Sequence, residues 1–168
     1  MFNQYIILLR PHHWVKNLLI FFPIFLSPKE FTNIGIISSI YMFICFCLVA
    51  SGIYIFNDIK DAKKDRINTR TKNRPFAQGT ITIHKGYSLS LVLITIAIIL
   101  SIILVPKASS LLLLYIIINI LYTLYFKYIV ILDVLSVASG FLIRIVAGGI
   151  VAEINQSIWT LLIISFAS

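Results

Sequence analysis

The chain has 168 residues, of which 60% are hydrophobic and only 12% are charged. Soluble domains carry about 25% charged residues, so this chain has too little charge to cover a water-facing surface. The net charge of +8 comes from basic residues at the ends of apolar segments and in one loop, where membrane topology explains them and no nucleic-acid partner is required.

Long apolar stretches follow one another along the chain, and the longer ones have room for the roughly 20 residues of a membrane-spanning helix. This pattern predicts an all-α fold, a polytopic transmembrane helical bundle that forms a single membrane domain over residues 1–168 in the lipid bilayer. Five complete segments are expected: Trp14–Leu26, which is short and contains Pro23, Ile34–Phe56, Gly86–Val105, Ala108–Phe126 and Ile131–Ala152.

A sixth apolar segment begins near Ile154 and has about 15 residues before the sequence stops at Ser168, too few to span a bilayer. We therefore expect the chain to be a fragment of a larger bundle.

Basic residues fall mainly on one side of such a bundle. If the segments alternate in direction, the side of the N-terminus receives eleven basic residues and the other side receives two, Lys29 and Lys107. The positive-inside rule then places the N-terminus and the loop 57–85 in the cytoplasm. We expect the protein to lie in the bacterial plasma (inner) membrane. The eleven residues are Arg10, Lys16, Lys60, Lys63, Lys64, Arg66, Arg70, Lys72, Arg74, Lys85 and Lys127.

Three aspartates follow the second apolar segment at helical spacing. The stretch Asn57–Arg66 contains no glycine or proline, so the helix is expected to continue through it. At 100° per residue, Asp58, Asp61 and Asp65 share an arc of about 60°, and the neighbouring lysines lie elsewhere. Carboxylates three and four residues apart repel one another, and a hard cation removes that repulsion.

This arrangement indicates a magnesium site for a diphosphate at the mouth of the bundle, with Asp58, Asp61 and Asp65 as ligands. The alternative is a solvated loop whose acids offset its many bases. Downstream, Arg66, Arg70, Lys72 and Arg74 offer the forked and point-charge contacts that phosphates require. The same residues would also be explained by the positive-inside surplus alone.

Two charged residues interrupt the fifth segment, Asp133 and Arg144. An arginine within a span is costly unless it is paired or faces a cavity. The two residues lie on nearly the same helix face but about 16 Å apart along the axis, too far for a salt bridge. They would either line one cavity or be an interfacial aspartate and a snorkelling arginine. Gly148-Gly149 indicates close helix packing.

The motif Asn57-Asp58-x-x-Asp61-x-x-x-Asp65, followed by Arg74-Pro75-x-x-x-Gly79, resembles the first acidic motif of the UbiA-type membrane prenyltransferase superfamily. The opening Arg10-Pro11-His12-His13-Trp14-Val15-Lys16-Asn17 resembles its decaprenyl-phosphate phosphoribosyltransferase branch, as does Asp133-Val134 leading to Gly140-Phe141-x-x-Arg144. The resemblance runs from Arg10 to about Trp159.

The resemblance implies a central cavity, open to the cytoplasm and sideways to lipid, and a magnesium-dependent transferase. It implies Mg²⁺ on the three aspartates, with Asn57 as a supporting ligand or as a residue that orients them. It also implies substrate contacts from Lys16, Asn17, Arg66, Arg70, Lys72, Arg74, Asp133 and Arg144.

The preferred function is transfer of a phosphoribosyl group from 5-phosphoribosyl diphosphate to a polyprenyl phosphate. An alternative keeps the fold and transfers a prenyl group from a prenyl diphosphate to an aromatic or other small acceptor. Both involve a lipid and a diphosphate-bearing molecule. A hypothesis of another class is an inactive truncated membrane fragment. A transporter is disfavoured because the dense polar cluster lies in a loop and not at mid-membrane.

Overall fold

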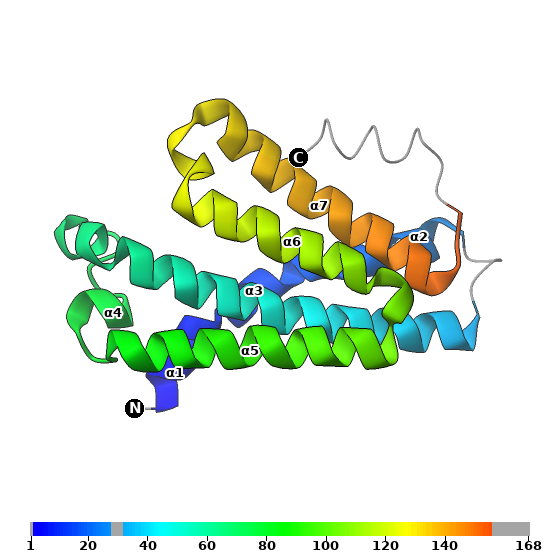
Figure 1. Cartoon of the computed structure of the whole chain (residues 1–168), viewed down its shortest axis with the longest axis horizontal. Helices are drawn as coiled ribbons and strands as arrows, with labels where there is room; N and C mark the ends of the chain where they lie inside the picture. The colour runs from blue at the N-terminus through cyan, green and yellow to red at the C-terminus, as the bar shows by residue number, and fades with distance from the viewer. Residues whose placement is uncertain (1, 28–31, 156–168) are drawn as a thin grey trace.

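The structure is a computed structural model that describes residues 2–27 and 32–155. Within these residues every regular element is helical, as the composition predicted (Figure 1). The elements are α1 (Phe2–Leu9), η1 (Pro11–Phe21), α2 (Phe22–Leu26), α3 (Asn33–Ile67), α4 (Pro75–Gln78), α5 (Ile83–Leu104), α6 (Pro106–Leu124), η2 (Phe126–Tyr128) and α7 (Val130–Ala152).

Four helices, α3, α5, α6 and α7, are long and apolar enough to cross a membrane. They correspond to the second to fifth predicted segments, whose existence and approximate bounds are confirmed. The predicted sixth segment falls almost entirely outside the described residues.

The first predicted segment, Trp14–Leu26, differs from the expectation because it is not one continuous α-helix. It lies within the 3₁₀ helix η1 and the short helix α2. Pro23 has no backbone N–H, so the carbonyl of Leu19 is bonded instead by the N–H of Phe22, three residues on. A 3₁₀ helix rises about 2.0 Å per residue, so the 11 residues of η1 span about 22 Å. The five residues of α2 add about 8 Å, which brings the pair to about the thickness of the hydrocarbon core.

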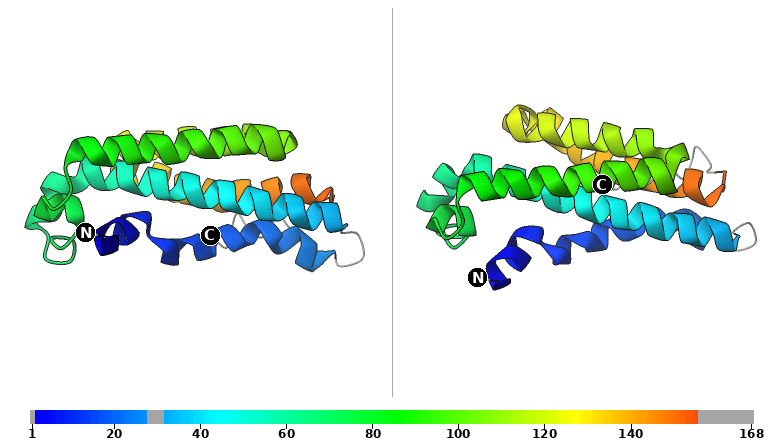
Figure 2. Two further views of the ribbon diagram at one scale, coloured as in Figure 1. Left: turned by 90° about the horizontal axis from the view of Figure 1, so that it is seen from below. Right: turned by 60° about the horizontal axis from the view of Figure 1, so that its bottom comes forward.

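The helices form two antiparallel pairs with the N-terminal segment packed beside them. α5 lies along α3, α6 lies along α7, and η1 contacts both α3 and α7. The two views of Figure 2 show the N-terminal segment running along α3 on the side away from α5. A core of buried residues from η1, α3, α6 and α7 joins the pairs; its members include Ile20, Phe46, Leu112 and Ala147.

A glycine permits the contact between η1 and α7. A Cβ atom on Gly148 would lie 2.0 Å from the backbone oxygen of Ile20, so no larger residue fits without displacing η1. This confirms the close packing expected of the Gly148-Gly149 pair. Because η1 also carries Lys16 and Asn17, the approach sets how deep these two side chains lie in the bundle.

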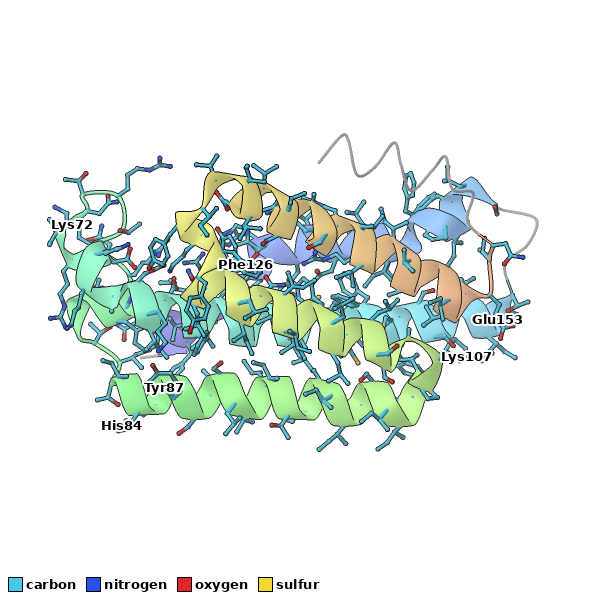
Figure 3. All side chains as sticks on the ribbon, turned by 45° about the horizontal axis from the view of Figure 1, so that its top comes forward. Lys72, His84, Tyr87, Lys107, Phe126 and Glu153 are labelled. Atoms are coloured by element: carbon cyan, nitrogen blue, oxygen red, sulfur yellow. The ribbon has the colours of Figure 1, made fainter. Side chains whose placement is uncertain are left out.

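The basic residues gather at one end of the bundle. Figure 3 places Lys72 at one end and Lys107 with Glu153 at the other. Lys107 and Glu153 form an exposed ion pair that joins the start of α6 to the end of α7. The structure thus separates the two ends in the way that the predicted topology requires.

We predict that the end bearing Lys72 is cytoplasmic, because the positive-inside rule retains basic loops on that side. A cysteine at Lys72 should resist an impermeant thiol reagent added to intact cells, and a cysteine at Lys107 should react. Both positions are exposed, and Cys45 and Cys47 are buried, so the native thiols give little background. Labelling at position 72 but not at position 107 would reverse the orientation.

We predict that Gly148→Ala destabilises the bundle by about 1–3 kcal/mol, since the added methyl group meets backbone and not a flexible side chain. Thermal unfolding of the purified protein in detergent measures the loss. Leu135→Ala on the same helix is the control, because Leu135 is 57% exposed and should shift the midpoint much less. Equal shifts in the two variants would contradict this account of the η1–α7 contact.

Candidate active site

α3 continues through the acidic motif, as the absence of glycine and proline predicted, and ends at Ile67. The side chains of Asp58 and Asp65 are 3% and 9% exposed, and that of Asp61 is 21% exposed. Lys60, Lys63 and Lys64 lie in the exposed part of the same helix. The helix therefore turns its acids inward and its lysines outward, which separates the two kinds of charge.

One arginine bridges two of the buried carboxylates. The Nη1 atom of Arg74 lies 3.1 Å from Oδ1 of Asp58 and 2.9 Å from Oδ2 of Asp65. Nη2 of Arg10 donates to the same Asp58 oxygen at 2.6 Å. Arg74 precedes Pro75, which keeps its backbone extended (φ −66°, ψ 143°) and leads into α4. Three separate parts of the chain therefore meet at Asp58.

Asp61 forms an ion pair with another basic residue and is not bonded by Arg74 or Arg10. Its Oδ1 atom accepts from Nζ of Lys127 at 2.6 Å, and the same Nζ lies 3.4 Å from Oδ1 of Asn57. Lys127 stands in η2, the short link between α6 and α7. This contact ties the end of α3 to that link.

Sequence reasoning named neither Arg10 nor Lys127 as a site residue, although both were placed on the cytoplasmic side. Arg10 opens the branch-specific motif that starts at Arg10-Pro11, and Lys127 is the one basic residue between the fourth and fifth apolar segments. Both signals were present, but the partner of each lies more than 45 residues away and is supplied only by the fold.

The acidic residues fit a divalent cation only in part. Asp58 and Asp65 already converge on one cationic nitrogen, and magnesium takes one or two carboxylates together with phosphate oxygens. No group of three or more His, Cys, Asp and Glu side chains is placed to hold one metal within the described residues. Asp58 and Asp65 fit a magnesium ion if Arg74 moves aside. A centre made of all three aspartates stays a prediction.

The remaining loop residues lie outside this cluster. Arg66, Arg70 and Lys72 are exposed, and none of them forms an ion pair within residues 2–27 and 32–155. They are accessible to a ligand from water, but no contact yet assigns them to the site.

A polar cavity of about 210 Å³ lies between η1, α3, α6 and α7. Tyr54 lines it and stands one helical turn before Asp58, about 6 Å along the α3 axis, so the cavity adjoins the acidic cluster of Asp58, Asp61 and Asp65. Tyr54 also packs beneath the guanidinium of Arg10. On the α6 side the cavity is lined by Tyr122, which lies next to Asp133.

Arg144 lines the inner part of this cavity and is 5% exposed. Its Nε donates to Oδ1 of Asn17 at 2.7 Å, its Nη1 to the carbonyl of Gly140 at 2.6 Å, and its Nη2 to the hydroxyl of Tyr115 at 2.8 Å. These contacts hold the side chain inside the bundle and rule out the snorkelling alternative. Arg144 and Asp133 form no ion pair, as their separation along the helix predicted.

The sequence profile described as the UbiA prenyltransferase family matches residues 17–168. The chain belongs to this family. Its fold is similar to that of a UbiA homolog from Archaeoglobus fulgidus whose structure was determined with DMAPP and Mg²⁺ bound. The TM-score is 0.83 at 18% sequence identity, over 97% of this chain and 59% of that one. Family and helices together make this UbiA-family chain an integral membrane protein.

Within the family, the chain is similar to decaprenyl-phosphate phosphoribosyltransferases, which confirms the predicted branch. It is 35% identical to the protein of that name from Mycolicibacterium smegmatis over 163 residues, 95% of this chain and 51% of the relative. It is 33% identical to the one from Corynebacterium glutamicum over 164 residues, 95% of this chain and 49% of the relative. The chain thus spans about half the length of the curated relatives it matches.

We predict that Asp61 and Lys127 are energetically coupled by about 0.5–3 kcal/mol, because both are largely shielded from water. A double-mutant cycle with Asp61→Asn and Lys127→Met, followed by unfolding in SDS, measures the coupling. The exposed pair Lys107–Glu153 is the matched control, for which Lys107→Met and Glu153→Gln should show no measurable coupling. Additive effects at both pairs would show that the contact with η2 does not hold α3 in place.

Proposed function

We propose that this UbiA-family chain belongs to a membrane transferase that moves a phosphoribosyl group from 5-phosphoribosyl diphosphate to a polyprenyl phosphate. The observation that carries the proposal is the position of two buried, converging carboxylates, Asp58 and Asp65, directly above a polar cavity that lies within the membrane bundle. Similarity to proteins named decaprenyl-phosphate phosphoribosyltransferase supports the choice of substrates.

The acidic cluster suits the leaving diphosphate. Asp58 and Asp65, with Asp61 as a third candidate and Asn57 as a supporting ligand, would hold Mg²⁺, whose charge neutralises the diphosphate as it departs. Arg74 holds the two carboxylates together in the absence of substrate. When the diphosphate binds, Arg74 would turn toward one of its oxygens, to which the planar guanidinium group is equally suited. Arg66, Arg70 and Lys72 would extend this basic lining.

The chemistry requires no covalent enzyme nucleophile. An oxygen of the lipid phosphate attacks the anomeric carbon of the ribose, forms the new C–O bond, and the diphosphate leaves with the oxygen of the broken bond. The reaction centre passes through a state with oxocarbenium character. The protein contributes by holding the reactants in line and by placing positive charge at the departing group. Lys16, Asn17, Asp133 and Arg144 would position the reactants in or beside the cavity.

A second candidate function keeps the acidic site and changes the donor. The similar archaeal structure was determined with DMAPP and Mg²⁺, and DMAPP is a prenyl diphosphate. In that case a prenyl group would pass to an aromatic or other small acceptor. The acidic motif serves both reactions, because each releases a diphosphate.

Radiolabelled substrate separates the two functions. The full-length membrane protein is given magnesium, polyprenyl phosphate and 5-phosphoribosyl diphosphate labelled in the ribose. Label in the lipid phase supports phosphoribosyl transfer. If the label stays in water while a prenyl diphosphate is consumed with an aromatic acceptor, the second function is correct.

We predict that Asp58→Asn and Asp65→Asn each lower magnesium-dependent diphosphate release by about 100-fold or more, since an amide cannot supply the charge that holds the ion. Membrane insertion should be unaffected. Glu153→Gln, at the opposite end of the bundle, is the control and should retain full activity. Near-normal rates in both aspartate variants would exclude the site.

Asp61→Asn in the same assay decides how many aspartates hold the ion. A loss equal to that of Asp58→Asn supports the three-aspartate centre. A clearly smaller loss supports the pair, because Asp61 is engaged by Lys127 and not by Arg74.

A further inference from the structure

Arg144 is a buried charge that has no counter-charge among residues 2–27 and 32–155. It is 5% exposed in the middle of α7, and all three of its hydrogen-bond acceptors are neutral: an amide, a backbone carbonyl and a phenol. No carboxylate lies within ion-pair distance of it in the described part of the chain. Burying an ion is unfavourable unless an opposite charge offsets it, and an arginine cannot lose its proton to avoid that penalty.

The carboxylates of the acidic cluster differ from Arg144 because their charges are paired. Each aspartate there has at least one basic partner at 3.1 Å or less, so its charge is offset within the protein. Around Arg144 the fold instead leaves a cavity of about 210 Å³. An intramembrane ionisable group that faces a cavity marks a functional site, and its missing partner is expected to be a ligand.

The cavity holds a second cation. Lys16 lines it from η1, with its Nζ 5.8 Å from the centre of the Phe141 ring, and it has no ion pair among the described residues. None of the described residues that line the cavity is acidic. Tyr115 accepts a hydrogen bond from Arg144, which leaves its own O–H free to donate into the cavity.

We propose that Lys16, Arg144 and Tyr115 form a seat for a phosphate monoester, separate from the acidic cluster. A phosphate monoester carries −1.5 to −2 charges near neutral pH, about the charge of the two cations. A magnesium–diphosphate complex needs acidic ligands, which this cavity lacks, and a single carboxylate would leave one cation unpaired. Tyr54 lines the same cavity and stands one helical turn before Asp58, so a monoester in the cavity lies close to the departing diphosphate.

The identity of the ligand that occupies the seat in the cell rests on the proposed function. Two phosphate monoesters in that reaction have the required chemistry. One is the 5-phosphate of the ribose donor, and the other is the head of the polyprenyl phosphate. Both present the same dianion, so the experiment has to distinguish them.

The test measures binding to the full-length protein in lipid nanodiscs without magnesium and without diphosphate. Ribose 5-phosphate and farnesyl phosphate serve as probes, and isothermal titration together with the ligand-induced rise in melting temperature serves as the readout. Lys16→Met and Arg144→Met should each weaken binding about 10- to 100-fold, which is the effect of losing a charged hydrogen bond. Lys107→Met, which removes a basic residue at the far end of the bundle, should leave it unchanged.

Lys16 is exposed and outside the core, so its variant tests the seat even if Arg144→Met fails to fold. Loss of ribose 5-phosphate binding alone assigns the seat to the donor, and loss of farnesyl phosphate binding alone assigns it to the acceptor. The seat is overturned if neither substitution weakens the binding of either probe, or if benzoate binds and neither phosphate probe does.

The transfer assay is scored separately. If the two variants lose phosphate binding but the native protein moves no ribose label into lipid, the seat stands and the proposed reaction fails. If label is transferred but phosphate binding does not depend on Lys16 or Arg144, the reaction stands and the seat fails.

Discussion

The bundle depends on how it compensates buried charge at the end of α3. Three carboxylates on one helix face would repel one another and would resist burial in an apolar bundle. The fold brings a base to each of them from a different place: Arg10 from before η1, Arg74 from before α4, and Lys127 from η2. Because each base lies far away in sequence, pairing the acids also fixes how the N-terminal segment, the loop and the α6–α7 link sit around α3.

The position of the N-terminal segment is set by this charge pairing and by one glycine. Arg10 anchors the start of the segment on Asp58, and Gly148 admits the backbone of Ile20 against α7. Between these points Trp14 bonds to Ser51, and Asn17 bonds to both Cys47 and Arg144. The stretched 3₁₀ geometry of η1 lets a short segment reach across the bundle while it carries Lys16 and Asn17 to the cavity.

Two neighbouring polar regions thus differ in their state of charge. The acidic cluster is neutralised by the protein itself, and under the proposed function a substrate complex would replace Arg74 there. The cavity below it keeps two cations and no acid in the described lining. An arrangement of this kind is suited to a transfer reaction, in which one group leaves with its charge neutralised and another anion is held in place nearby.

The sequence by itself determined the class of the protein and the helix face that carries the three acids of the candidate site. Hydropathy and length specified the apolar helices, because a bilayer demands about 20 apolar residues for each crossing. The spacing of Asp58, Asp61 and Asp65, free of glycine and proline, was enough to place three acids on one helical face. The charge asymmetry between the loops predicted which residues would share an end of the bundle.

Only the tertiary structure decided what those residues contact. Helical periodicity places side chains on a face but is silent about partners 48 or 66 residues away, as with Arg10 on Asp58 and Lys127 on Asp61. It therefore could not show that Asp61 is engaged apart from the other two acids. Nor could it show that Arg144 bonds an amide, a carbonyl and a phenol, all of them neutral, since that depends on how η1, α6 and α7 pack together. Local spacing follows from the covalent chain, whereas counter-charges are supplied by packing.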